Sequence, residues 1–279
     1  SLRSLLSSAV SCSVYLHRSI RLHRQMCLRA RDMTSQRAFV TQLVPQDFVL
    51  LGRPGLCLPL SRVMATAIAQ KGEPGANQFA SVLFDAAAHP DSQIATNVYT
   101  TVGQLHSNTD AGLAETDAGR LSIKGIVSNL EKESLTNGSS KFMLMNTRAH
   151  SMLVGKRQFE GKSRYFFYDP NFAVFRFDSS KALQASLKEH LIKNKFARFY
   201  DAYGNASQPT FDMRSLDTAK MAEVRLSTGL SVQDLASPSD RVANLATADH
   251  AARLAPASDR LPTDFQHKTA RSGPPGAPF

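Results

Sequence analysis

A cysteine, a histidine and an aspartate have the types and spacing that nucleophilic chemistry requires. Cys57 lies in the stretch "GRPGLCLPLSRVMATAIA", and His150 and Asp169 bound the stretch "HSMLVGKRQFEGKSRYFFYD". A thiolate can attack a carbonyl carbon, an imidazole can carry the proton, and a carboxylate can orient the imidazole. If the fold brings these three groups together, they could perform acyl transfer.

The stretch from His150 to Asp169 has the pattern of a β-hairpin. Two runs rich in aromatic and branched residues flank a charged segment that contains Gly161. If the strands reverse at residues 158–161, His150 lies opposite residues 169–171. Opposed side chains of an antiparallel pair share one face, so a carboxylate could reach the imidazole and favour its charged form. A surface cross-strand pair without a function is the alternative.

Cys57 precedes the strongest helical pattern in the chain. Apolar residues recur at helical spacing over residues 58–70, and Gly72 follows them. The thiol is therefore expected at a helix N-terminus, where backbone N–H groups and the macrodipole stabilise a thiolate. The alternative is a small apolar core residue, because free cysteines are often buried.

The elements that must position these side chains come in two blocks. Helical patterns come first, and short strand-like runs with turn residues between them follow. The predicted fold class is α+β, with a helical N-terminal half packed on an antiparallel sheet. The expected helices cover residues 58–70, 76–90, 91–108 and 179–195, the last capped by Ser179 or Ser180, and the expected strands cover residues 141–148, 150–159, 163–170, 173–178 and 197–204.

Charge and composition divide the chain into three parts. The net charge is +10, and residues 1–40 contain seven arginines and one acidic residue. Residues 1–40 are interpreted as a basic leader, either flexible or directed to a membrane surface. Residues 41–205 are expected to form the compact domain. Residues 206–279, rich in small and polar residues, are expected to be a linker or partly ordered tail.

Several function classes are disfavoured by the sequence. The basic excess lies mainly outside the expected domain, which argues against nucleic acid as a partner. No apolar run approaches the roughly 18 residues of a membrane span. The three cysteines (Cys12, Cys27 and Cys57) form no CxxC pair, so neither a metal site nor a cofactor is predicted. His190, on the helix after the sheet, is expected to face water.

The order of these motifs resembles the YopT/AvrPphB-type papain-like cysteine peptidases, a group of bacterial effectors and toxin modules. The resemblance covers about residues 45–180, and its most specific element is "FFYDPNF", residues 166–172. It implies that Cys57 is the nucleophile, His150 the general base and Asp169 the orienting acid. Papain-like enzymes often bind the oxyanion with an amide upstream of the cysteine, and Gln46 is the nearest such residue.

The resemblance also implies a function. The chain is expected to be a cysteine peptidase that cleaves a host protein or its own precursor, after secretion by a bacterium into the host cytoplasm. The basic leader could direct it to a membrane surface there. Two alternatives remain open: a deamidase, transglutaminase-like or acyltransferase toxin domain with the same three residues, and a non-enzymatic interaction module.

Overall fold

The protein consists of one large antiparallel sheet with helices on both faces. The computed structural model describes residues 39–42, 56–88, 93–227 and 229–237. The helices are α3 (Cys57–Lys71), α4 (Glu73–Ala88), α5 (Gln93–Gln104), α6 (Thr109–Leu113), α7 (Ile123–Glu131), α8 (Ser180–Lys188), α9 (Phe196–Phe199), α10 (Thr218–Glu223), α11 (Val232–Ala236) and a π-helix, η2 (Glu189–Lys193). The strands are β1 (Phe39–Gln42), β2 (Glu115–Ser122), β3 (Ser140–Asn146), β4 (Ser151–Phe159), β5 (Lys162–Asp169), β6 (Ala173–Phe177), β7 (Tyr203–Gly204) and β8 (Pro209–Leu216). The predicted α+β class is confirmed.

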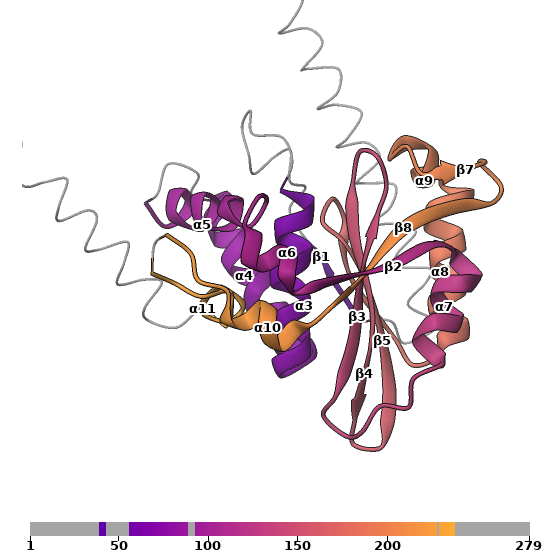
Figure 1. Cartoon of the computed structure of the whole chain (residues 1–279), viewed down its shortest axis with the longest axis horizontal. Helices are drawn as coiled ribbons and strands as arrows, with labels where there is room; N and C mark the ends of the chain where they lie inside the picture. The colour runs from indigo at the N-terminus through magenta and orange to yellow at the C-terminus, as the bar shows by residue number, and fades with distance from the viewer. Residues whose placement is uncertain (1–38, 43–55, 89–92, 228, 238–279) are drawn as a thin grey trace, which may run out of the picture.

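The sheet separates two hydrophobic cores. Its strand order is β1-β6-β5-β4-β3-β8-β2, with β7 paired to β8. Figure 1 shows α3 to α6, α10 and α11 on one side of the sheet and α7 and α8 on the other. Along β3, Phe142 and Leu144 enter the core beneath α3, while Met143 and Met145 enter the core beneath α7 and α8. A sheet buried on both faces needs apolar residues at successive positions, which explains the continuous run FMLM.

The central hairpin forms as the sequence predicts. β4 and β5 are antiparallel, and the last pair is Phe159 with Lys162. Glu160 and Gly161 between them both have positive φ, of 50° and 72°. Two such residues make a type I′ turn, whose twist matches that of the flanking strands. The turn sets the register that carries β5 back toward the start of β4.

Helix α3 is attached to β4 near both of its ends. Near its start, the buried Ser61 hydroxyl donates to the Ser151 carbonyl at the first residue of β4. At its end, the Arg157 side chain donates to the carbonyls of Ala69 and Gln70, which have no helical partner. These contacts hold the N-terminus of α3 beside the start of β4.

A buried ion pair joins α3 to the edge of the sheet. Arg62 lies within 2.7 Å of Glu115 through Nε and also donates to the Leu105 carbonyl. Both charged side chains are almost fully buried, and Arg214 lies 3.6 Å from the second Glu115 oxygen. A buried ion pair adds little net stability, but removing one partner leaves a charge without compensation.

Arg62→Met is therefore expected to lower the free energy of unfolding by about 3–5 kcal/mol, measured by urea denaturation. The double variant Arg62→Met/Glu115→Leu should recover part of this loss, because neither charge is then orphaned. If Arg62→Met costs less than about 1 kcal/mol, the pair is not a structural anchor.

The folded body extends past residue 205, where the sequence analysis placed a linker or partly ordered tail. Strand β8 lies inside the sheet between β3 and β2, and Met221 and Val232 of the helices that follow are buried in the core with α3. The linker interpretation is wrong for residues 209–237. Residues 238–279 and residues 1–38 of the predicted basic leader (residues 1–40) lie outside the described residues, while residues 39 and 40 belong to β1. The strand predicted at residues 197–204 is also wrong, since α9 and a two-residue strand occupy that stretch.

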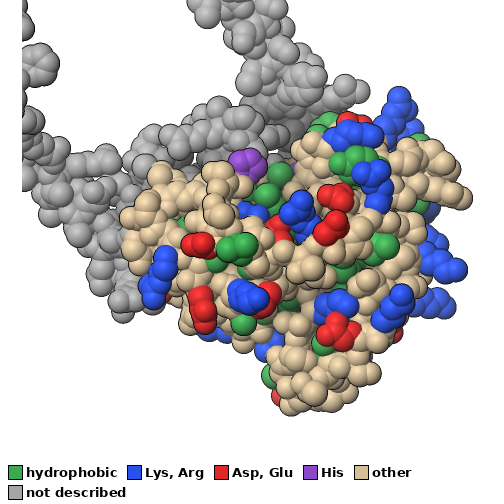
Figure 2. Space-filling view, in the orientation of Figure 1, with side chains coloured by type: hydrophobic (Ala, Val, Ile, Leu, Met, Phe, Trp, Pro, Cys, Tyr) green, Lys and Arg blue, Asp and Glu red, His purple; other side chains and the backbone are tan. Residues whose placement is uncertain are grey.

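The surface of the described residues carries charges of both signs. Figure 2 shows Lys and Arg side chains interspersed with Asp and Glu across the visible face. Several form ion pairs, such as Arg164 with Asp178 and Arg148 with Asp201. Within the same residues, no helix has both the length and the apolar character needed to cross a membrane.

Candidate active site

The thiol of Cys57 lies at the first residue of α3, as the sequence predicts. Leu56 is the N-cap and makes no side-chain capping bond, so no capping side chain competes for the N–H groups of the first turn. The His150 side chain and the backbone N–H groups of Ser151 and Leu58 act on the thiol, and each of them lowers its pKa. The attachment of Ser61 to Ser151 holds the two elements in this arrangement.

His150 lies in a tight turn between β3 and β4. The Thr147 hydroxyl accepts from the His150 backbone N–H at 2.9 Å, and the His150 carbonyl accepts from the Thr147 N–H at 2.8 Å. The Ala149 N–H donates to the Tyr200 carbonyl, and the imidazole stacks on the Tyr200 ring at 4.0 Å between centroids. The backbone and the ring of His150 are therefore both held in place.

Asp169 is placed by the Asp-Pro-Asn-Phe turn at the end of β5. The Phe172 N–H donates to the Asp169 carbonyl at 2.9 Å, and the Asn171 N–H donates to the Asp169 carboxylate at 3.0 Å. Proline suits the second position of such a turn because its φ is already fixed. An aspartate at the first position can accept a hydrogen bond from the backbone two residues on. The motif thus orients its own carboxylate.

The carboxylate of Asp169 meets His150 diagonally. Continuing the β4–β5 register places Met152 opposite Asp169, so His150 lies two residues beyond the opposed position. His150 Nε2 is nevertheless 2.9 Å from Asp169 Oδ1, within reach for a diagonal pair. Because Nε2 is occupied by the carboxylate, Nδ1 is the ring nitrogen left to interact with the thiol. The structure thus places His150 in interaction with both the Cys57 thiol and the Asp169 carboxylate.

A second histidine completes the surroundings of the carboxylate. His190 Nε2 lies 2.8 Å from Asp169 Oδ2, and the Tyr200 hydroxyl donates to the same oxygen at 2.9 Å. The expectation that His190 faces water is wrong, because only 5% of its surface is exposed. The burial of His190 could have been predicted from its spacing, because it shares a helix face with Leu183 and Leu187, which are fully buried.

Charges and burial shift the pKa values of all three residues. Burial raises the pKa of the Cys57 thiol, but the hydrogen bond and charge of His150 outweigh it and leave the pKa below its usual value. Burial opposes protonation of His150, yet the charge and hydrogen bond of Asp169 raise its pKa to about 9. Burial disfavours the charged form of Asp169, but His150 and then His190 hold its pKa well below the usual range. The site can therefore hold a thiolate–imidazolium pair near neutral pH.

Two further observations bound the site. Among the described residues, no group of three or more His, Cys, Asp and Glu side chains is arranged to hold a metal ion. Gln46, the expected oxyanion residue, lies outside the described residues, so its position relative to Cys57 stays a prediction.

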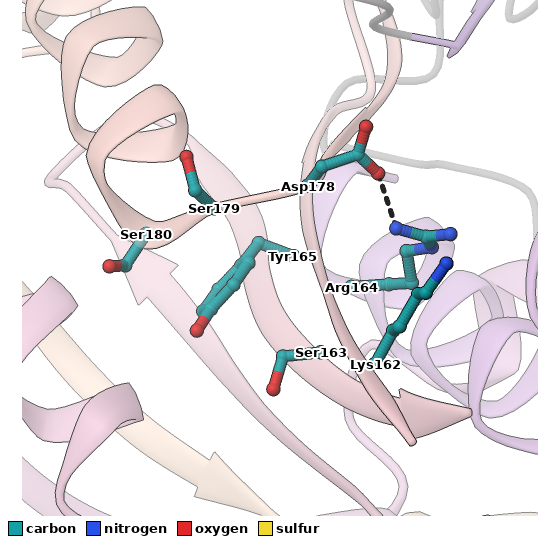
Figure 3. A pocket seen from close by; sticks show the side chains of 7 residues that line it. All are labelled: Lys162, Ser163, Arg164, Tyr165, Asp178, Ser179 and Ser180. Atoms are coloured by element: carbon teal, nitrogen blue, oxygen red, sulfur yellow. Dashed lines mark hydrogen bonds and ion pairs between the residues drawn. The ribbon is translucent and has the colours of Figure 1, made fainter. Parts of the chain in front are cut away.

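A polar pocket lies at the other end of β5. Figure 3 shows that Lys162, Ser163, Arg164 and Tyr165 line it from the strand, opposite residues 178–180 before and at the start of α8. The Arg164 guanidinium is paired with Asp178 across it. At about 3.3 Å a residue along β5, Arg164 lies roughly 16 Å from Asp169, so this pocket is separate from the candidate site.

The fold has a solved counterpart. The crystal structure of PatoxP, a cysteine protease-like domain of the Photorhabdus asymbiotica toxin PaTox, superposes with a TM-score of 0.54 over 71% of this chain and 59% of that chain, at 19% identity. The chain therefore shares the mixed α+β fold of this cysteine protease-like domain. The Pseudomonas avirulence protein AvrPphB superposes with a TM-score of 0.30 over 62% of this chain and 97% of that chain, at 13% identity. That score is too low to show a shared fold by itself.

The chain belongs to the Mcf1 protease effector domain family, which matches residues 3–247. The toxin Afp18 of Yersinia ruckeri is 28% identical over 186 residues, 66% of this chain and 8% of that protein. A toxin of Photorhabdus asymbiotica is 27% identical over 194 residues, 66% of this chain and 6% of that protein. The chain thus corresponds to a small part of each relative. The predicted protease effector or toxin module is confirmed.

Proposed function

We propose that this domain is a cysteine peptidase in which Cys57 is the nucleophile, His150 the general acid and base, and Asp169 the residue that orients His150. The observation that carries the proposal is the chain of interactions that runs from the thiol through His150 to a buried carboxylate. This chain joins the N-terminus of α3 to the end of β5, two places that are 112 residues apart in the sequence. Membership of a protease effector domain family supports the same reaction class.

The proposed reaction proceeds through an acyl-enzyme. The Cys57 thiolate attacks the peptide carbonyl carbon, and the carbonyl electrons move onto oxygen. The C–N bond then breaks as the His150 imidazolium gives its proton to the departing amine. The neutral imidazole takes a proton from water, whose oxygen attacks the thioester, and the carboxylic acid product leaves as the thiolate is restored. Asp169 stabilises the imidazolium at each stage where it forms.

The oxyanion needs hydrogen-bond donors near the sulfur. The N-terminus of α3 offers backbone N–H groups and the positive end of the helix macrodipole. We expect the Cys57 N–H to be one donor, and Gln46 stays the candidate for the other.

The proposed substrate is a host protein. The two toxins from Yersinia ruckeri and Photorhabdus asymbiotica support delivery of such a domain by a bacterium. We expect action in the host cytoplasm, a compartment that keeps cysteines reduced and therefore suits a thiol nucleophile. Membrane contact through residues 1–40 remains part of the proposal, as does processing of a precursor that contains this chain.

The type of product tests the peptidase proposal. Eukaryotic cell extract is incubated with the wild-type chain or with Cys57→Ala, and new protein N-termini are identified by mass spectrometry. We expect new termini that depend on Cys57. A shift of about +1 Da at a glutamine would mean a deamidase, and an added acyl or amine group would mean a transferase, because the thioester then meets a different acceptor. Equal termini with Cys57→Ala would refute the role of the thiol.

A further inference from the structure

The carboxylate of Asp169 is enclosed by four hydrogen-bond donors. Oδ1 accepts from His150 Nε2 and from the Asn171 N–H, while Oδ2 accepts from His190 Nε2 and from the Tyr200 hydroxyl. An ionised carboxylate offers about four lone-pair positions, so every one of them is used. Only one of these four donors, His150, takes part in the proposed reaction.

The donors to Oδ2 come from the core opposite the cysteine. Cys57 begins α3 on one side of the sheet, whereas His190 and Tyr200 belong to the chain segment that follows α8 on the other side. Asp169 follows Tyr168 on β5, and successive strand residues point to opposite faces. Tyr168 is buried in the core with α3, so the Asp169 side chain points to the face of His190. The site is therefore built across the end of the sheet.

A local departure from α-helix brings His190 to the carboxylate. The helix that begins at Ser180 changes to a π-helix over Glu189–Lys193. Such π-turns are rare and often occur at functional sites. Lys195 then takes a left-handed conformation, with φ of 64°, which starts the short α9 before Tyr200. The π-helix therefore contains the first donor, His190, and the left-handed Lys195 lies between it and the second donor, Tyr200.

Aromatic packing holds His190 in this place. Its ring stacks on Phe196 at 4.6 Å between centroids and meets the edge of Phe172 at 5.1 Å. Phe172 ends the Asp-Pro-Asn-Phe turn, so the motif that presents Asp169 also packs against the histidine that binds it. Tyr200 is held by its stacking on His150 and by a hydrogen bond from Asn171.

We propose that His190 and Tyr200 are positioning residues that fix the carboxylate of Asp169, so that Oδ1 stays aligned with His150. The inference deepens the proposed function, since it matters only if His150 and Cys57 react. Without these two donors, Oδ2 is a buried anionic oxygen whose lone pairs have no hydrogen-bond partner, and only the contacts of Oδ1 restrain the rotation of the carboxylate. The imidazolium then loses its fixed partner, and the thiolate that depends on the imidazolium loses stability.

The pH dependence of Cys57 alkylation measures this coupling directly. Iodoacetamide reacts with the thiolate, so its rate follows ionisation of Cys57 and needs no substrate protein. The titratable side chains that act on Asp169 or Cys57 are His150, Tyr168, His190 and Tyr200, and each lies on a different segment. Tyr200→Phe removes one oxygen atom and His190→Leu removes the ring donor, so each variant deletes one hydrogen bond to Oδ2.

The control is Tyr165→Phe. Tyr165 also lies on β5, and its hydroxyl donates to a carboxylate, that of Glu131 on α7 rather than that of Asp169. The control removes the same atom and the same kind of hydrogen bond at another place. His190→Gln is a rescue variant, because the amide nitrogen of glutamine can take the place of Nε2 as a donor.

We expect the acidic limb of the alkylation profile to move up by about one pH unit in Tyr200→Phe and in His190→Leu. The value of kcat should fall by about 10-fold in each, with KM little changed, since loss of alignment acts on the reacting groups. His190→Gln should restore most of the wild-type alkylation profile and most of the wild-type kcat. Tyr165→Phe should match the wild type.

Two results would overturn the inference. One is a Tyr200→Phe chain that melts at the wild-type temperature with unchanged alkylation and kcat. The other is an equal shift in Tyr165→Phe, which would mean that any lost hydroxyl loosens the domain. Failure of the peptidase proposal gives a different result. If the wild-type chain cleaves no protein, the alkylation profiles of Tyr200→Phe and His190→Leu would still be shifted relative to that of the wild type.

Discussion

His150→Ala is expected to lower kcat for proteolysis by roughly 10⁵- to 10⁶-fold, the size of the effect when one member of a nucleophile–base pair is removed. The imidazole holds the thiolate through its charge and then protonates the departing amine. With alanine at residue 150, burial would raise the pKa of the Cys57 thiol with no charge to oppose it. The variant should also lose its rapid alkylation at pH 6.

The same residue sets the alkaline limit of activity. The pKa of His150 is raised to about 9, so the imidazolium persists through neutral pH and is lost as the pH rises through about 9. Because protonation of the departing amine needs the imidazolium, kcat/KM of the wild type should fall over that range.

The control for His150→Ala is His106→Ala. His106 is exposed near the end of α5, so it tests the loss of an imidazole without loss of the site. This variant should keep wild-type kcat and alkylation. Retention of more than about one hundredth of wild-type kcat by His150→Ala would exclude His150 as the general base.

Asp169→Asn is expected to lower the free energy of unfolding by about 3–5 kcal/mol at neutral pH, because it removes the anion from a buried charge pair. Asp169 has no exposed surface, and donors point at both of its oxygens. An asparagine nitrogen would direct its own hydrogens at two of those donors. Activity should fall by on the order of 10⁴-fold, since the imidazole loses its orienting charge.

The loss of stability should depend on pH. The folded-state pKa of Asp169 lies well below the unfolded value of 3.8, so the unfolded chain binds the proton more readily. The stabilisation that the ionised Asp169 carboxylate contributes to folding is therefore fully present above about pH 4 and is lost as the pH falls through the folded-state pKa. Urea denaturation at several pH values should show that the difference in the free energy of unfolding between the wild type and Asp169→Asn becomes smaller in acid.

Asp178→Asn provides the matched control for Asp169→Asn. Asp178 pairs with Arg164 at the surface and is partly exposed, so the same substitution should change stability by less than about 1 kcal/mol. An Asp169→Asn chain as stable as the Asp178→Asn chain at neutral pH would contradict a buried, ionised Asp169.

Helices and strands with strong periodicity could be predicted from the sequence. The helix predicted at residues 58–70 is observed at Cys57–Lys71, and the strand predicted at residues 163–170 is observed at Lys162–Asp169. Both patterns are local, because apolar spacing and turn residues act within one element. The β4–β5 hairpin was predictable for the same reason, since its turn residues lie next to its strands.

Strand β8 was missed although its sequence alternates as a strand should. Phe211 and Met213 are buried and Arg214 is exposed, but the surrounding small and polar residues suggested a linker. Its partners are β2 and β3, which are 66 to 101 residues away at their paired positions. Pairing over that distance depends on the rest of the sheet, which no local pattern describes.

The sequence by itself determined the three side chains of the candidate site and the elements that carry them. Cys57 precedes a helical pattern, His150 directly precedes the first strand of one hairpin, and Asp169 ends the second strand, so local sequence patterns placed each of them. Only the tertiary structure decided that α3 lies against the start of β4 and that His190 and Tyr200 enclose the carboxylate from the opposite core. Those contacts arise from the packing of two helical layers on one sheet, and packing joins residues whose separation along the chain carries no periodic signal.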